Sequence, residues 1–286
     1  MNKKLQALYG LKWNPFAPDV PVEALLTTPA LESFCWRIEN VQLREGGFAL
    51  VSGDPGLGKS VSLRLLEERL SHVGGEVRVA ILSHPSSSLS SFYRELGDLF
   101  GVELTPRNRW GGFKALRERW HEHIESTLMR PVLLVDEAQE MQPKVLTELR
   151  ILSSTRLDSR VILSVVLAGD RRLTEKLRCE ELVALGSRIR LRLALEPAST
   201  GELTAVLDHL LKAAGNKALM TQGLRDTLVE RSAGNYRVLA NLGGELLAEG
   251  VRRESKRLDE KLFLELYGGG SGGDAVPART RKRRRR

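Results

Sequence analysis

The fold of this chain is decided by the stretch Gly53-Asp54-Pro55-Gly56-Leu57-Gly58-Lys59-Ser60. It fits the pattern G-x-x-x-x-G-K-[ST], which binds nucleotide phosphates where a strand leads into a helix. An apolar run over 48–52 precedes the stretch and a helical pattern over 59–72 follows it. Backbone N–H groups of such a loop surround phosphate oxygens, and the helix amino terminus adds partial positive charge. We expect all eight residues to contact the nucleotide, with Lys59 at the β- and γ-phosphates and the Ser60 hydroxyl on Mg²⁺.

On both sides of this loop, short apolar runs alternate with helical patterns. The predicted strands cover 48–52, 77–83, 132–136, 161–168 and 189–193, and the predicted helices cover 30–44, 59–72, 89–100, 112–128 and 144–154. Strands that are apolar throughout are typical of a parallel sheet with helices on both faces. From Ser199 onward the pattern is only helical, and it begins with the capping-box spacing of Ser199 and Glu202. The sequence predicts an α/β fold, a P-loop parallel sheet flanked by helices, followed by a small all-α lid.

Four segments are predicted along the chain. They are an opening segment and helix (1–46), the α/β nucleotide-binding domain (47–197), the helical lid (198–267), and a Gly/Ser linker with an Arg-rich tail that we expect to be disordered (268–286). The net charge of +8 comes mostly from the tail, whose last 13 residues hold seven Lys or Arg and one Asp. The body is therefore nearly neutral. The tail is either a solubilising extension or a non-specific nucleic-acid arm.

Composition excludes several classes of protein. No apolar stretch approaches the about 20 residues that a membrane-spanning helix needs, and the first residues lack the pattern of a signal peptide. The two cysteines, Cys35 and Cys179, have no metal-ligand spacing and cannot form a disulfide framework. We therefore expect a cytoplasmic protein with no membrane partner.

A second motif is the apolar run 132–135 followed by Asp136 and Glu137. Ligands bind at the carboxyl ends of the strands in a parallel sheet, so we expect this acidic pair beside the phosphate loop. Asp136 would hold Mg²⁺ through water, and Glu137 would polarise the attacking water. Together the two motifs predict a site for ATP and Mg²⁺.

These residues resemble the AAA+ ATPases, and within that group the secretion- and transposition-associated ExeA/TniB/TnsC set. Residues 9–16 (YGLKWNPF) are similar to the opening of ExeA-like chains, and residues 165–173 match the strand and turn at their sensor-1 position. Residues 187–190 look like the arginine-finger box, and residues 234–237 look like the sensor-2 box. The resemblance covers about residues 5–266.

The resemblance implies roles for individual residues. Arg188, with Arg190 as the alternative, would reach the γ-phosphate bound by a neighbouring subunit, and Arg237 would contact it from the lid. Asp170 occupies the sensor-1 position, where these families usually have a neutral polar residue. Slow hydrolysis and a shifted register both stay open there. The opening segment implies that Asn14 and Phe16 lie near the adenine.

Basic residues gather around Trp110, which makes this segment the best candidate for contact with DNA phosphates. The residues expected to bind DNA are His84, Arg107, Arg109, Lys114 and Arg117. His84 is included because related transposition ATPases present DNA-contacting loops at its position. No helix-turn-helix or zinc-finger signature is present, so base-specific contacts are not expected. The alternative for the basic segment is a solvated helix face.

The resemblance implies an AAA+ ATPase that assembles on double-stranded DNA as a ring or filament and recruits or activates a transposase. Hydrolysis that is slow or stimulated by DNA fits this role. The alternatives are an ExeA-like secretion ATPase, a replication initiator or helicase loader, and an ATP-gated scaffold. We expect transposition because no membrane span, wall-binding region or winged helix is recognisable after Tyr267.

Overall fold

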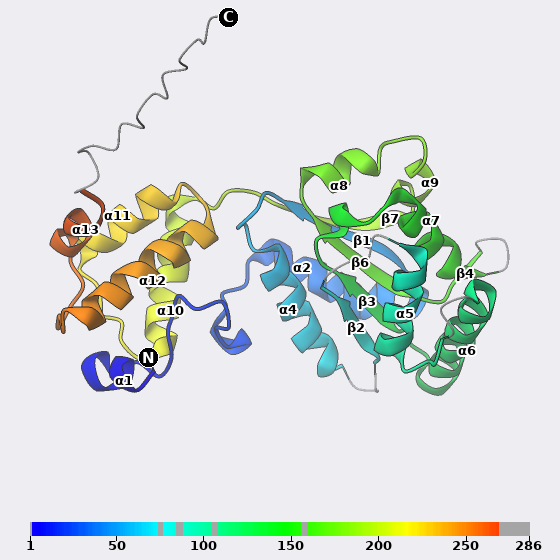
Figure 1. Cartoon of the computed structure of the whole chain (residues 1–286), viewed down its shortest axis with the longest axis horizontal. Helices are drawn as coiled ribbons and strands as arrows, with labels where there is room; N and C mark the ends of the chain where they lie inside the picture. Colours follow the sequence, from blue (N-terminus) through cyan, green and yellow to red (C-terminus); the bar gives the residue numbers. More distant parts are fainter. Residues whose placement is uncertain (1, 74–76, 84–87, 105–107, 156–158, 269–286) are drawn as a thin grey trace, which may run out of the picture.

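The computed structural model describes residues 2–73, 77–83, 88–104, 108–155 and 159–268. Within these ranges the centre is a parallel five-stranded sheet in the order β2-β3-β6-β1-β7 (Figure 1). Its strands are β1 Gly47–Gly53, β2 Val79–Leu82, β3 Val132–Val135, β6 Ser164–Gly169 and β7 Ile189–Leu195. A short antiparallel pair, β4 Ser154–Thr155 and β5 Arg160–Val161, precedes β6. The predicted fold class is confirmed.

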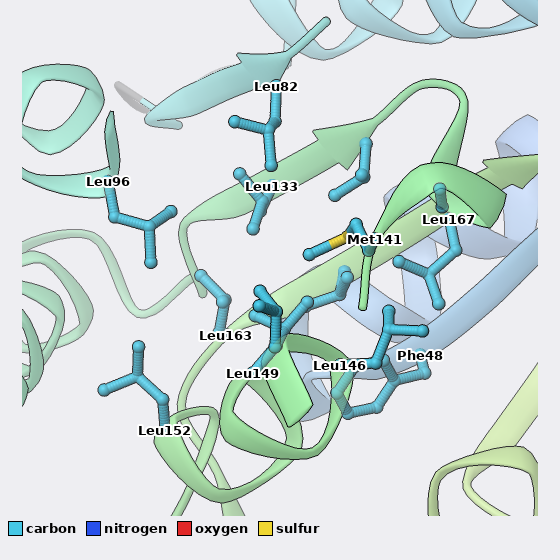
Figure 2. Close-up of a cluster of buried hydrophobic side chains, with 14 of the residues drawn as sticks. Phe48, Leu82, Leu96, Leu133, Met141, Leu146, Leu149, Leu152, Leu163 and Leu167 are labelled. Atoms are coloured by element: carbon cyan, nitrogen blue, oxygen red, sulfur yellow. The ribbon is translucent and has the colours of Figure 1, made fainter. Parts of the chain in front are cut away.

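Alternate residues of the strands face two separate apolar clusters, as the two-residue period of a strand requires. In β1, Phe48 and Leu50 belong to one cluster, and Ala49 and Val51 belong to the other. The first cluster, part of which is drawn in Figure 2, packs against α5 Leu89–Phe100, α6 Arg109–Thr127, α7 Pro143–Leu152, α8 Arg171–Lys176 and α9 Val183–Gly186. The second packs against α2 Pro29–Arg37, α3 Leu43–Glu45 and α4 Lys59–Ser71. Helices on both faces explain why the strands are apolar throughout.

The strand order shows how the acidic pair lies relative to the phosphate loop. β6 pairs with both β1 and β3, so one strand separates the acidic pair from the phosphate loop. All six residues of β6 are buried, which is the pattern of a central strand. Because the three strands are parallel, their carboxyl ends at Gly53, Val135 and Gly169 meet at the same edge of the sheet.

The predicted helix over 30–44 contains a wider turn. A π-helical turn, Ile38–Gln42, lies between α2 and α3 and buries the Gln42 side chain. Its Nε2 donates to the Gly47 carbonyl at 3.2 Å and to the Ser164 hydroxyl at 2.9 Å. The turn thereby joins this helix to the beginnings of β1 and β6.

The C-terminal region is helical, as predicted. It contains α10 Thr200–Ala214, α11 Gln222–Ser232, α12 Tyr236–Arg252 and α13 Glu260–Tyr267. The capping box of Ser199 and Glu202 is present at the start of α10. Among the described helices, none is both long enough and apolar enough to cross a bilayer.

The opening residues pack with this helical region. Leu5 and Tyr9 of α1 Asn2–Tyr9, together with Leu11 and Phe16, share an apolar cluster with α10, α11, α12 and α13. In Figure 1, α1 accordingly lies beside these helices and away from the sheet. The predicted opening segment is therefore divided, since α2 packs against the sheet. The domain boundaries at 46, 197 and 267 stay predictions.

Candidate functional site

The loop between β1 and α4 is shaped by its glycines. Gly56 and Gly58 have φ angles of +86° and +97°, which residues with a Cβ rarely adopt. Leu57 between them is buried and anchors the loop. Since α4 begins directly after Gly58, the N–H groups of its first turn are available at this loop. Such a loop and helix end provide the donors that a phosphate group needs.

Lys59 supplies the positive charge of this loop. The residue is only 5% exposed, and its Nζ donates to the carbonyl oxygens of Gly53 at 2.9 Å and Asp54 at 3.2 Å. A buried ammonium requires acceptors, and charged phosphate oxygens are stronger acceptors than carbonyls. The donor set therefore fits a phosphate, and the exposed Ser60 beside Lys59 offers a hydroxyl to a metal ion.

The acidic pair follows β3 in an unusual backbone conformation. Glu137 has a φ of +50°, and its N–H donates to Asp136 Oδ1 at 2.9 Å. Such a conformation costs a non-glycine residue about 1–3 kcal/mol and is found mostly at functional sites. Among the described residues, no three His, Cys, Asp or Glu side chains could hold a metal ion by themselves. A magnesium ion at Ser60 and Asp136 would therefore take its remaining ligands from phosphate and water.

Gln139 connects the acidic turn to the end of β6, although no motif in the sequence singles it out. Its Nε2 donates to the Glu137 carboxylate, and its Oε1 accepts the Asp170 N–H at 3.2 Å. Lys176 of α8 donates to the carbonyl oxygen of Gln139 and, at 3.1 Å, to that of Met141. The turn that carries Glu137 is therefore attached to both β6 and α8.

Asp170 begins α8, and a cation compensates its charge. Its Oδ1 accepts the Arg172 N–H at 2.9 Å, and its Oδ2 lies 2.8 Å from Arg172 Nη2. Burial raises the pKa of the Asp170 carboxyl, but hydrogen bonds from Arg172 and the positive charge of Lys59 outweigh it and hold that pKa below its usual range. Asp170 is thus an ionised carboxylate within the electrostatic reach of the phosphate loop.

The start of α12 contacts the phosphate loop directly. Asn235 Nδ2 donates to the Pro55 carbonyl at 2.9 Å, and the Arg237 N–H donates to the Gly56 carbonyl at 3.3 Å. A Cβ on Gly56 would lie 2.2 Å from Asn235 Oδ1, so only glycine permits this approach. The exposed Arg237 side chain therefore begins next to the loop. Asn235 lies in the segment that resembles the sensor-2 box, but its contact with Pro55 spans 180 residues and has no sequence signal.

Arg188 and Arg190 lie at the amino end of β7, whereas the phosphate loop follows the carboxyl end of β1. Phe48 pairs with Ile189 and Gly53 with Leu195, so Arg188 is about 15–20 Å of strand away from the phosphate loop of its own chain. Arg188 Nη1 donates to the Ala184 carbonyl at 2.5 Å, and Arg190 forms an ion pair with Glu45. Neither arginine is therefore placed to act on a nucleotide in the same chain.

The structure places Asn14 and Phe16 in a turn within the helical region. Asn14 Oδ1 accepts the Phe16 N–H at 3.0 Å. Phe16 is 8% exposed, and its ring packs so closely on Gly243 that a Cβ there would lie 2.5 Å from it. Phe16 thus has a packing role, and adenine contact by either residue stays a prediction.

The α6 residues expected to bind DNA lie partly on one face of the helix. Trp110, which is 66% exposed, stacks on Phe113 with ring centroids 5.5 Å apart and planes 7° apart. Lys114 Nζ lies 5.9 Å from the Trp110 centroid, and the Arg117 guanidinium lies 4.9 Å from the Phe113 centroid. We call these four residues the α6 face. His84 and Arg107 lie outside the described residues.

Arg109 differs from the α6 face because it has a buried partner. Its Nε donates to Glu148 Oε1 at 2.9 Å, and Tyr93 donates to the same oxygen at 2.5 Å. Glu148 is 3% exposed, so this pair holds α6 against α7. The Arg109 guanidinium already forms an ion pair with Glu148 within the chain. A contact between Arg109 and DNA stays a prediction.

Two sequence comparisons bear on this site. Residues 42–177 match the family described as AAA domain. The chain is also 31% identical over 217 residues to General secretion pathway protein A of Aeromonas hydrophila, an alignment that covers 74% of this chain and 39% of that protein. The chain thus spans less than half the length of this relative.

Solved structures share the fold. The ORC2 protein of Aeropyrum pernix in its ADP form has a TM-score of 0.71 at 17% identity, covering 90% of this chain and 72% of that one. The ORC1 protein of the same organism, in complex with DNA, has a TM-score of 0.62 at 17% identity, covering 89% and 68%. The segment that matches the AAA domain family contains the phosphate loop, the acidic pair and Asp170, and the solved structures share the fold.

Proposed function

We propose that the protein is an ATPase that assembles on duplex DNA and recruits or activates a transposase. The observation that carries the ATPase part is the meeting of Lys59, the acidic pair and Asp170 at one edge of the sheet. Lys59 and the loop N–H groups would hold the phosphates, while Ser60 and Asp136 would hold Mg²⁺. The metal would neutralise charge on the phosphate oxygens. Glu137 would take a proton from the attacking water.

The position of Arg188 supports a site shared between two subunits. The strand length of about 15–20 Å between Arg188 and the phosphate loop exceeds the reach of a side chain. A second copy of the chain could bring Arg188 to the γ-phosphate, where a guanidinium stabilises the charge of the transition state. The active form would then be a homo-oligomer.

Mixing two inactive variants is expected to restore activity if the site is shared. Arg188→Ala should bind ATP as the wild type does but hydrolyse it slowly, and Lys59→Ala should not bind ATP. A mixed interface joins the intact loop of one variant to the intact Arg188 of the other. Steady-state ATPase rates across a series of mixing ratios check this. No recovery in assemblies shown to contain both variants would contradict a shared site.

The α6 face supports the DNA part of the proposal. Lys114 and Arg117 flank a stacked pair of rings, so positive charge and an exposed indole lie on one surface. Lysine and arginine bind DNA phosphates with little dependence on base sequence. Target selection requires that DNA binding respond to the nucleotide, and the α6 face belongs to the same α/β fold as the phosphate loop.

We predict that the α6 face, rather than the tail, gives DNA binding that depends on ATP. Truncation after Tyr267 should weaken DNA binding and flatten its salt dependence while preserving the dependence on ATP. Lys114→Glu in the truncated chain should weaken the ATP-dependent component by about 10-fold. Lys144→Glu, at an exposed position on α7, is the matched control. The measurement is the fluorescence anisotropy of labelled duplex DNA with ATP, ADP or no nucleotide, at two salt concentrations.

Two outcomes of that measurement would contradict the role of the α6 face. One is a truncated protein whose DNA binding no longer depends on the nucleotide, while the full chain keeps that dependence. The other is equal loss of binding in Lys114→Glu and Lys144→Glu.

A second candidate function is that of a secretion ATPase, which the likeness to General secretion pathway protein A favours. The transposase part of the first proposal rests on the resemblance to the TniB and TnsC families. DNA-stimulated ATP hydrolysis would support the first candidate, as would a transposase gene beside the gene for this chain. An ATPase rate that is the same with and without DNA, together with secretion genes beside the gene for this chain, would support the second.

A further inference from the structure

Gln139 is a buried polar side chain that contacts the acidic pair. It is 2% exposed, so its carboxamide must find its hydrogen bonds within the protein. Its Oε1 accepts the Asp170 N–H, and its Nε2 donates to Glu137 Oε2. Because only the oxygen can accept from an N–H, the amide has one orientation, with its donor toward Glu137. The side chain therefore bridges the turn after β3 and the end of β6.

The packing around this bridge is tight. A Cβ on Gly169 would lie 2.7 Å from Gln139 Oε1 and 2.7 Å from Leu173 Cδ2, so only glycine lets the amide approach β6. Lys176 holds the main chain at Gln139 from α8. The Gln139 amide is therefore closely packed against β6. A displacement of the end of β6 would shift this amide and, through its hydrogen bond, the Glu137 carboxylate.

We propose that Gln139 is a positioning residue for hydrolysis, which holds the Glu137 carboxylate in place and couples it to the end of β6 beside the nucleotide. This inference rests on the proposed function, in which Glu137 is the general base. With Oε2 occupied by the amide, Oε1 is the oxygen presented to water. A general base must lie within hydrogen-bond reach of the proton it removes, so loss of the bridge lowers turnover rather than ATP affinity.

Three variants test this role in the full-length protein. Gln139→Leu removes both hydrogen bonds at similar size and should lower kcat by about 10- to 100-fold, with the Kd for a fluorescent ATP analogue changed by less than about twofold. Gly169→Ala should push the amide away and lower kcat in the same direction. Gln142→Leu, at an exposed position three residues along the chain, is the matched control and should behave as the wild type.

Gln139→Glu distinguishes positioning from packing, because it has nearly the same shape. At neutral pH it places a second carboxylate against Glu137 and should lower kcat. Thermal unfolding of each variant reports whether it is folded.

The kcat and Kd of these variants, compared with those of Glu137→Gln, decide between the outcomes. Wild-type kcat in folded Gln139→Leu would overturn the inference while leaving the proposed function intact. Wild-type kcat in folded Gln139→Glu would do the same, since that variant keeps the packing but replaces the amide donor by a carboxylate. If wild-type turnover is absent, or is unchanged in Glu137→Gln, the proposed function itself fails and the role of Gln139 falls with it.

Discussion

Replacing Lys59 by alanine is expected to weaken ATP binding by about 100-fold or more. Each hydrogen bond to a charged group contributes about 1.5–3 kcal/mol, and Lys59 would contact more than one phosphate oxygen. The Lys59 ammonium is buried against the Gly53 and Asp54 carbonyls, so the substitution removes a positive charge from within the loop. Titration with a fluorescent ATP analogue measures the effect.

The control for this variant is Lys144→Ala, which removes an exposed lysine from α7. It should bind ATP as the wild type does. The thermal unfolding midpoint of Lys59→Ala shows whether the loop change leaves the protein folded. ATP affinity at the wild-type level in folded Lys59→Ala would rule out the phosphate loop as the nucleotide site.

Replacing Glu137 by glutamine is expected to slow ATP turnover by about 100-fold or more while ATP affinity changes by less than about twofold. Glutamine keeps the shape of the side chain but cannot accept a proton from water. The left-handed backbone at Glu137 and its hydrogen bond to Gln139 hold this side chain at the end of β3. Single-turnover hydrolysis separates the chemical step from product release.

Glu140→Gln is the matched control, because Glu140 is an exposed carboxylate three residues further along the same turn. It forms an ion pair with Arg172 at 2.8 Å and should tolerate the change. Equal hydrolysis rates in Glu137→Gln and the wild type would remove Glu137 from the role of general base.

The five strands of the central sheet were predictable because each depends on local sequence. The run Phe48–Ser52 is apolar at every position facing either cluster, which identifies a strand buried on both faces. The capping box at Ser199 identifies a helix start. The order of the strands was not predictable in the same way, because periodicity reports burial and not which strands pair. The insertion of β6 between β1 and β3 is such a feature.

The same distinction applies to the site. Lys59 and Glu137 could be named as candidates because their neighbours in sequence form recognisable motifs. The bonds from Gln139 to Asp170 and from Asn235 to Pro55 join segments that only the fold brings together.

Arg109 lies in a basic segment of the sequence, which predicted a cation available to DNA. The structure instead pairs Arg109 with Glu148, 39 residues away. A charge pattern in sequence cannot show which charges are neutralised by partners from another helix.

Sedimentation velocity of the full chain with labelled duplex DNA, in ATP, ADP or no nucleotide, tests the central claim most directly. We predict DNA-bound assemblies larger than one subunit with ATP, smaller species with ADP, and no ATP-dependent assembly in Lys59→Ala. A protein that binds ATP but sediments with DNA as the same species under all three conditions would contradict an ATPase that assembles on DNA.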